Sequence, residues 1–301
     1  NRNRDFVKFM RNGVLKIFAA LFGLGMLVSC ANNKLTTEID TLEIVFRPIV
    51  SPNTKLAYSD DKSFPATLPF RLWAFDSAGE SLLDGVDAYP VGDGLWKVAG
   101  DLLCSRKDEE LTIYAAAPSE RMDFDKEKGV LVKGYSMGED VDLFYSTAVL
   151  ATEKGSAVME LPLSFQHALA SLRILVTNNL STTSTLTVKE LILSDIVTES
   201  DFSSLPAPRW SAGSQSGELV FWKGETILSD GENELEPAQF LIPQSTYAKC
   251  TLVCDVETGT SVLRDQVLSA NFALNLRSGK YTTYRVSIYG DLSIKIEKDG
   301  I

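Results

Sequence analysis

The chain is poor in the residues on which most enzymes and metal sites depend. It has one histidine and four cysteines in 301 residues, and no glycine-rich phosphate loop occurs. A histidine-based triad would have to use His167, and no nucleophile-elbow pattern accompanies it. No pair of carboxylates is singled out as an acid–base pair. We therefore expect no catalytic residue, no metal site and no cofactor, and we expect His167 to bond to local backbone.

Basic residues are fewer than acidic ones. The chain has 29 Lys and Arg against 40 Asp and Glu, a net charge of −11, which disfavours nucleic acid as a partner. Cys250 and Cys254 are four residues apart in an alternating run. On a strand they would face the same side at roughly 13 Å, beyond disulfide reach. Together with Cys104, they are expected to be small buried hydrophobes.

One long apolar run stands near the start, from Val14 to Val28, and basic residues precede it. It is short of the roughly 20 residues that a membrane-spanning helix needs. The tetrad Leu27-Val28-Ser29-Cys30 fits a lipobox, in which a peptidase cuts before a cysteine that is lipidated. We expect residues 1–29 to be a lipoprotein signal peptide, with Met10 as the true start. Acyl chains on Cys30 would then tether the mature protein to a membrane.

The remainder of the chain has the pattern of short strands. They are rich in β-branched or aromatic residues and bounded by Gly, Pro, Asp or Asn, which is typical of sandwiches or barrels. Pro48 is expected to end the ladder of the first strand, and residues 165–170 are expected to form one helical turn. The predicted strands are Leu42–Arg47, Phe70–Phe75, Leu111–Ala116, Leu172–Thr177, Leu186–Leu193, Leu219–Trp222, Gln239–Ile242, Thr251–Val256, Tyr281–Tyr289 and Leu292–Ile296.

Two β domains account for the length after the signal. The best boundary is near Leu161-Pro162, where a polar stretch gives way to a new series of strands. This predicts an N-terminal domain over residues 30–160 and a C-terminal domain over residues 161–301. The tryptophans Trp73, Trp96, Trp210 and Trp222 are mostly expected in the cores, although exposed ones could form a platform for sugars.

Several of these features together resemble the fimbrillin family of Bacteroidetes, the subunits of type V pili. They span essentially the whole mature chain, and their order and spacing carry the resemblance. The features are the lipobox cysteine, the early strand 42–50, the segment 70–76 (Phe-Arg-Leu-Trp-Ala-Phe-Asp), the segment 163–173 (Leu-Ser-Phe-Gln-His-Ala-Leu-Ala-Ser-Leu-Arg) and the segment 278–286 (Ser-Gly-Lys-Tyr-Thr-Thr-Tyr-Arg-Val).

The resemblance implies an all-β fold of two tandem transthyretin-like β-sandwich domains. It also implies a precursor that travels as a lipoprotein to the outer membrane, where a protease that cuts after arginine removes the first strand. The open groove then accepts a strand from another subunit, because exposed ladder groups and an apolar groove favour strand addition.

On this chain, Arg47 is the candidate cleavage residue. The candidate displaced strand presents Leu42, Ile44 and Phe46, and the candidate donor strand presents Leu292, Ile294 and Ile296. The alternative is that both strands complete their own sheets.

Two departures from the family pattern favour an anchor, tip or accessory subunit as much as a shaft subunit. Pro48 follows Arg47, and trypsin-like proteases cut poorly before proline. The residues after Cys30 lack the acidic run that often marks surface-exported lipoproteins. We expect an outer membrane or fimbrial protein with other fimbrial subunits, and host or bacterial surface ligands, as partners. The alternative is a non-polymerising cell-surface lipoprotein that binds glycans or proteins.

Overall fold

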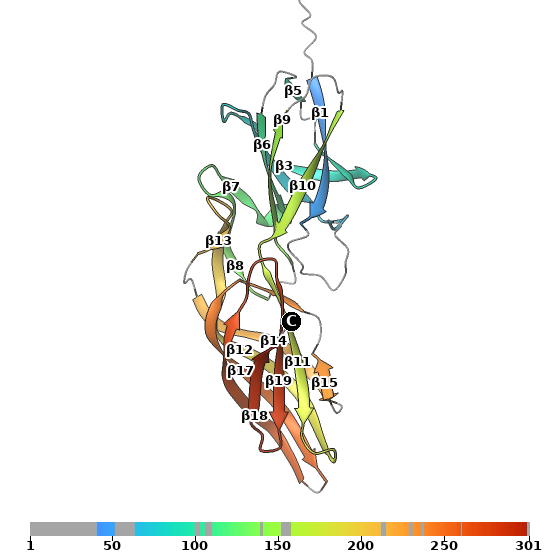
Figure 1. The fold of residues 1–301 in the computed structure, drawn as a ribbon, viewed down its shortest axis with the longest axis vertical. Coiled ribbons are helices and arrows are strands. Elements are labelled where there is room, and N and C mark those ends of the chain that lie inside the picture. Colours follow the sequence, from blue (N-terminus) through green and yellow to red (C-terminus); the bar gives the residue numbers. More distant parts are fainter. Residues whose placement is uncertain are drawn as a thin grey trace, which may run out of the picture. The chain divides into compact units, whose positions relative to one another are not determined.

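The computed structural model describes residues 41–51, 64–99, 103–105, 110–138, 141–151, 158–211, 215–228, 231–235, 238–259 and 261–299. Within these ranges the chain is built from strands (Figure 1). The single helical element there is the short 3-10 turn η1, Ser119–Arg121. No helix there is long and apolar enough to cross a membrane. The prediction of an all-β fold is confirmed.

The first sheet has eight strands in the order β10-β9-β6-β2-β3-β4-β1-β5, and β1 also pairs with β10. Leaving β5 aside, these strands therefore form a closed ring in which β1 is the link between β4 and β10. Their bounds are β1 Thr41–Val50, β2 Phe70–Phe75, β3 Ser81–Gly92, β4 Leu95–Val98, β5 Leu103–Ser105, β6 Glu110–Ala117, β9 Phe144–Ala151 and β10 Val158–His167.

The inside of the ring is an aromatic and aliphatic core. Strand alternation sends every second side chain inward, and Phe46, Phe70 and Phe165 are completely buried there. Phe64 packs against several of these rings, with its centroid 4.6 Å from that of Phe165. The core therefore depends on side chains from both β1 and β10.

The remaining strands form two further sheets. A five-stranded sheet has the order β15-β11-β19-β20 with β16 beside β11, and a seven-stranded sheet has the order β18-β17-β12-β8-β7 with β13 and β14 beside β12. A second core joins these sheets, formed mainly by residues after 170. The strands of the five-stranded sheet are β11 Ala170–Asn179, β15 Gly231–Glu234, β16 Gln239–Leu241, β19 Tyr281–Tyr289 and β20 Ile294–Lys298. Those of the seven-stranded sheet are β7 Asp123–Asp125, β8 Gly129–Ser136, β12 Ser184–Ser203, β13 Arg209–Trp210, β14 Gln215–Leu228, β17 Ser245–Thr258 and β18 Ser261–Asn275.

The expected break at Pro48 is wrong, because β1 continues to Val50. The N–H of Ser51 donates to the Phe165 carbonyl of β10 (2.8 Å). Because backbone N–H groups alternate along a strand, those of residues 47 and 49 point toward β10, as that of Ser51 does. The nitrogen of residue 48 points away from β10. Proline therefore removes no hydrogen bond to β10 at this position.

The helical turn expected at residues 165–170 is also wrong. β10 runs to His167, and β11 begins at Ala170 after a two-residue bend. The bend is buried, and the Ala168 N–H donates to the Leu143 carbonyl (2.8 Å). Pairing with neighbouring strands has overridden the local helical preference.

A buried carboxylate gives the β17–β18 hairpin a dependence on pH. Asp255 is 3% exposed in its side chain, and it accepts from Lys189 Nζ (2.7 Å), Arg264 Nη1 (2.7 Å) and the Asp265 N–H (2.8 Å). The hydrogen bond from Lys189, followed by that from Asp265, holds the Asp255 pKa well below its usual range.

A group whose pKa is lowered in the folded state stabilises the fold above its unfolded pKa of about 3.9 and loses that contribution as the pH falls further. We therefore expect Asp255→Asn to lower stability at pH 7 and to lose less stability than the parent chain between pH 7 and pH 3. Urea unfolding at both pH values measures this difference. Equal losses in the two proteins would contradict it.

Candidate functional site

β1 is held on both of its edges. It pairs in parallel with β10, from Glu43↔Val158 to Val50↔Phe165, and antiparallel with β4 through Phe46↔Trp96. Ile44 is 2% exposed and Phe46 is fully buried, so these two of the three predicted side chains face the ring core. Leu42 lies in β1, but its side chain lies outside what the structure describes, as does Cys30.

The candidate cleavage residue Arg47 is tied to the neighbouring strands. Its guanidinium forms an ion pair with the Glu160 carboxylate of β10 and donates from Nη1 to the Asp93 carbonyl (3.0 Å). The hydrogen bond with Glu160 raises the Arg47 pKa and lowers the Glu160 pKa. Both side chains are about two-fifths exposed, so solvent screens this pair and its contribution to stability is small.

The backbone around the bond from Arg47 to Pro48 is engaged in a ladder. Arg47 pairs with Pro162 and Pro48 with Leu163, and Pro48 is buried. A protease binds its substrate as an extended chain through free backbone groups, and a strand paired in a ladder offers fewer of them. In the closed ring, this bond therefore lies in a strand that is paired with β10.

The candidate donor segment differs from the predicted strand at its start. β20 begins at Ile294, because Leu292 lies in the tight turn after β19 with a left-handed φ of 62°. The Leu292 N–H donates to the Tyr289 carbonyl (2.8 Å), and the Asp291 carboxylate accepts from the Ser293 N–H (3.0 Å).

Among the described strands, β20 lies at an edge of its sheet and pairs only with β19. Ile294 and Ile296 are half-buried and pack, with Leu292, against the second core. Ile294 and Ile296 therefore complete their own sheet in this chain, and Leu292 packs on the same core from the adjoining turn.

His167 has a partner other than the one expected from the sequence. Its Nδ1 contacts the Asp142 carboxylate, not local backbone, and both side chains are about one-tenth exposed. The pairing of His167 with Phe144 across β10 and β9 brings Asp142 within reach. Burial raises the Asp142 pKa, and the hydrogen bond with His167 opposes that rise. Among the described residues, no group of three or more His, Cys, Asp or Glu could hold a metal ion.

The tryptophans, Cys250 and Cys254 mostly belong to cores, as expected, and the side chain of Cys104 lies outside what the structure describes. Trp73 and Trp96 are buried. Trp210 is half-buried and donates from Nε1 to the Ala168 carbonyl (2.9 Å), and Trp222 is half-buried against the second core. Cys250 and Cys254 are free and buried, and burial raises their thiol pKa values to about 12 and about 11.

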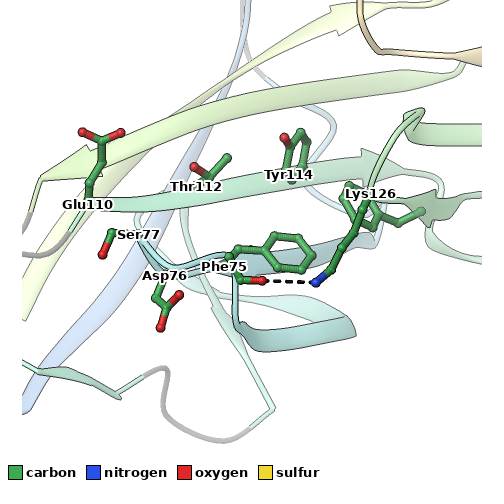
Figure 2. Close-up of a pocket in the computed structure, with 9 residues that line it drawn as sticks. Phe75, Asp76, Ser77, Glu110, Thr112, Tyr114 and Lys126 are labelled. Carbon is green, nitrogen blue, oxygen red and sulfur yellow. Dashed lines mark hydrogen bonds between the residues drawn. The ribbon is translucent and has the colours of Figure 1, made fainter.

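A pocket of about 490 Å³ lies on the outer face of the ring (Figure 2). Leu111 and Ile113 of β6 point into the ring core, so alternation points Glu110, Thr112 and Tyr114 outward. The lining is Phe75, Asp76, Ser77, Gly79, Glu110, Thr112, Tyr114, Phe124 and Lys126.

Aromatic rings form the floor of this pocket. Phe75 and Phe124 are stacked with centroids 5.3 Å apart, and Tyr114 lies 4.8 Å from Phe124. The Lys126 Nζ lies 5.4 Å from the centre of the Phe75 ring and donates to the Gly79 carbonyl (3.1 Å). Burial raises the Tyr114 pKa.

Sequence reasoning missed this pocket because its residues come from separated segments. Phe75 pairs with Thr112 and Trp73 with Tyr114 across β2 and β6, while Phe124 arrives from β7. One available signal was the aromatic residues at alternate positions of β2, on the face opposite Leu72 and Ala74.

Solved structures share this fold. The chain is similar to a candidate cell adhesion protein from Bacteroides ovatus, with 12% identity and a TM-score of 0.58 over 86% of this chain and 96% of that one. It is also similar to a candidate cell adhesion protein from Bacteroides fragilis, with 13% identity and a TM-score of 0.52 over 87% and 97%. The fimbrial anchor protein Mfa2 from Porphyromonas gingivalis is similar at 13% identity and a TM-score of 0.45, over 87% of this chain and 98% of that one.

No curated protein sequence is a match for this chain. The family model described as fimbrillin-like matches residues 57–298, which include every described strand after β1. This match fits a fimbrial subunit or adhesin at the cell surface, as the resemblance in the sequence predicted. The chain belongs to the fimbrillin-like family.

Proposed function

We propose that the chain is a subunit of a type V fimbria that joins other subunits by β-strand donation. The observation that carries this proposal is the position of β1, which closes the ring between β4 and β10. Without β1, two strand edges would lack partners, and unpaired edges readily accept another strand.

The energetic reason lies in the side chains that β1 supplies. Ile44, Val45 and Phe46 are at most 6% exposed, and burial of one such side chain is worth about 1.5–3 kcal/mol. A donor strand with apolar residues at alternate positions would restore much of this burial. Leu292, Ile294 and Ile296 offer that pattern, from a segment held by one neighbouring strand.

The position of this subunit in a fibre would depend on whether β1 is kept or removed. With β1 in place the ring is closed, so the chain can donate a strand but not accept one, which suits a terminal anchor or tip subunit. With β1 removed after Arg47, it could do both, as a shaft subunit must. Pro48 and the ladder around the bond favour the terminal position.

The remaining parts of the proposal concern location and organisation. Lipidation of Cys30 would anchor the protein in the outer membrane, with host or bacterial surface ligands as further partners. The chain would act without catalysis, as two tandem transthyretin-like sandwiches divided near residues 160 and 161.

Assembly of a cut chain tests this proposal. We expect Pro48→Ala protein, cut after Arg47 and separated from its N-terminal fragment, to form species larger than the monomer in gel filtration. The matched control, Arg47→Gln/Pro48→Ala, should resist the protease and stay monomeric. A cut, folded chain that also stays monomeric would refute strand donation.

A further inference from the structure

The aromatic pocket on the outer face of the ring is not explained by strand donation. Its floor is formed by Phe75, Tyr114 and Phe124, which pack on one another but stay half-exposed. None of its lining residues belongs to β1 or β20. A role of this pocket therefore goes beyond assembly.

The rim of the pocket carries both hydrogen-bond donors and hydrogen-bond acceptors. Glu110 and Asp76 supply carboxylates, Ser77 and Thr112 supply hydroxyls, and Lys126 supplies an ammonium (Figure 2). Asp76 is held in place because its Oδ1 accepts from the N–H groups of Ala78 (2.9 Å) and Glu80 (2.8 Å). Donors and acceptors thus surround an aromatic floor.

We propose that this pocket binds a neutral pyranose unit of a glycan. A pyranose has a face of C–H groups that packs on aromatic rings, and its edge of hydroxyl groups can both donate to carboxylates and accept from ammonium or hydroxyl groups. The volume of about 490 Å³ is within the range of small-molecule sites.

Other ligand classes fit less well. A cation would be attracted to the rings, but Lys126 already places its ammonium over Phe75. An apolar ligand would cover the carboxylates of Asp76 and Glu110 without offering them a hydrogen-bond donor, which is costly. A neutral polyhydroxylated ligand carries no charge for Lys126 to repel, and its hydroxyl groups can donate to both carboxylates.

Saturation-transfer NMR on the full chain tests the proposal. The probes are methyl β-D-galactopyranoside, methyl β-D-glucopyranoside and methyl α-D-mannopyranoside, with tetramethylammonium chloride as the cationic alternative. We expect at least one glycoside to receive saturation on its ring C–H protons. Glu110→Gln should weaken that binding by about fivefold to tenfold, since hydrogen bonds to charged groups are the stronger ones.

Glu127→Gln is the matched control, because Glu127 is an exposed carboxylate near Lys126 that does not line the pocket. This variant should bind the glycoside as the parent chain does. The proposal is overturned if no glycoside binds, if only tetramethylammonium binds, or if Glu110→Gln binds like the parent. Each of these outcomes leaves the assembly experiment unaffected, so the two proposals fail separately.

Discussion

Replacing Phe46 with alanine is expected to lower the free energy of unfolding by about 3–5 kcal/mol, the cost of removing a large side chain from a packed core. Phe46 is fully buried, in a cluster that includes Trp96 and Phe165. Its strand also closes the ring, because Phe46 pairs with Leu161 on one side and with Trp96 on the other. The cavity would therefore lie at the joint between β10 and β4.

Urea unfolding of the variant and the parent measures this cost. Ile49→Ala is the control on the same strand, because Ile49 is 40% exposed, and we expect it to cost less than about 1 kcal/mol. If Phe46→Ala also costs less than about 1 kcal/mol, β1 does not contribute to the ring core as the structure indicates.

Removing β1 is expected to create a binding site for the C-terminal segment. The chain that begins at Pro48 should bind the free peptide Leu292–Ile301 at least a hundredfold more tightly than the intact chain does. A hundredfold is about 2.8 kcal/mol, which burial of Ile294 and Ile296 in the vacated place can supply at about 1.5–3 kcal/mol each. In the intact chain β1 already occupies that place, and the peptide has to displace it.

The strand pattern predicted the all-β class and ten of the twenty strands in the part of the chain that the structure describes. Alternating apolar residues placed ten strands, and all ten fall within or overlap strands of the structure. Their partners could not be predicted, because register and order depend on contacts between distant segments. The parallel pairing of β1 with β10 joins residues more than 110 positions apart, and local sequence carries no signal for it.

The wrong predictions for Pro48 and His167 also come from contacts between distant segments. Pro48 was expected to end a strand, yet its nitrogen faces away from β10, so tertiary pairing tolerates it. His167 was expected to bond to backbone, but β9 brings the Asp142 carboxylate to its ring. For the candidate site, the sequence identified Ile44 and Phe46 as one apolar face of the first strand but could not show that this strand closes a ring.

Binding of the labelled peptide Leu292–Ile301, followed by fluorescence anisotropy, tests most directly whether β1 is a replaceable strand. The chain that begins at Pro48 is compared with the intact chain, and circular dichroism establishes that both contain folded β structure. We predict saturable binding to the shortened chain, weak or no binding to the intact chain, and loss of binding when the peptide carries Ile294→Asp and Ile296→Asp. Equal binding to both chains, or none to a folded chain without β1, would contradict the account.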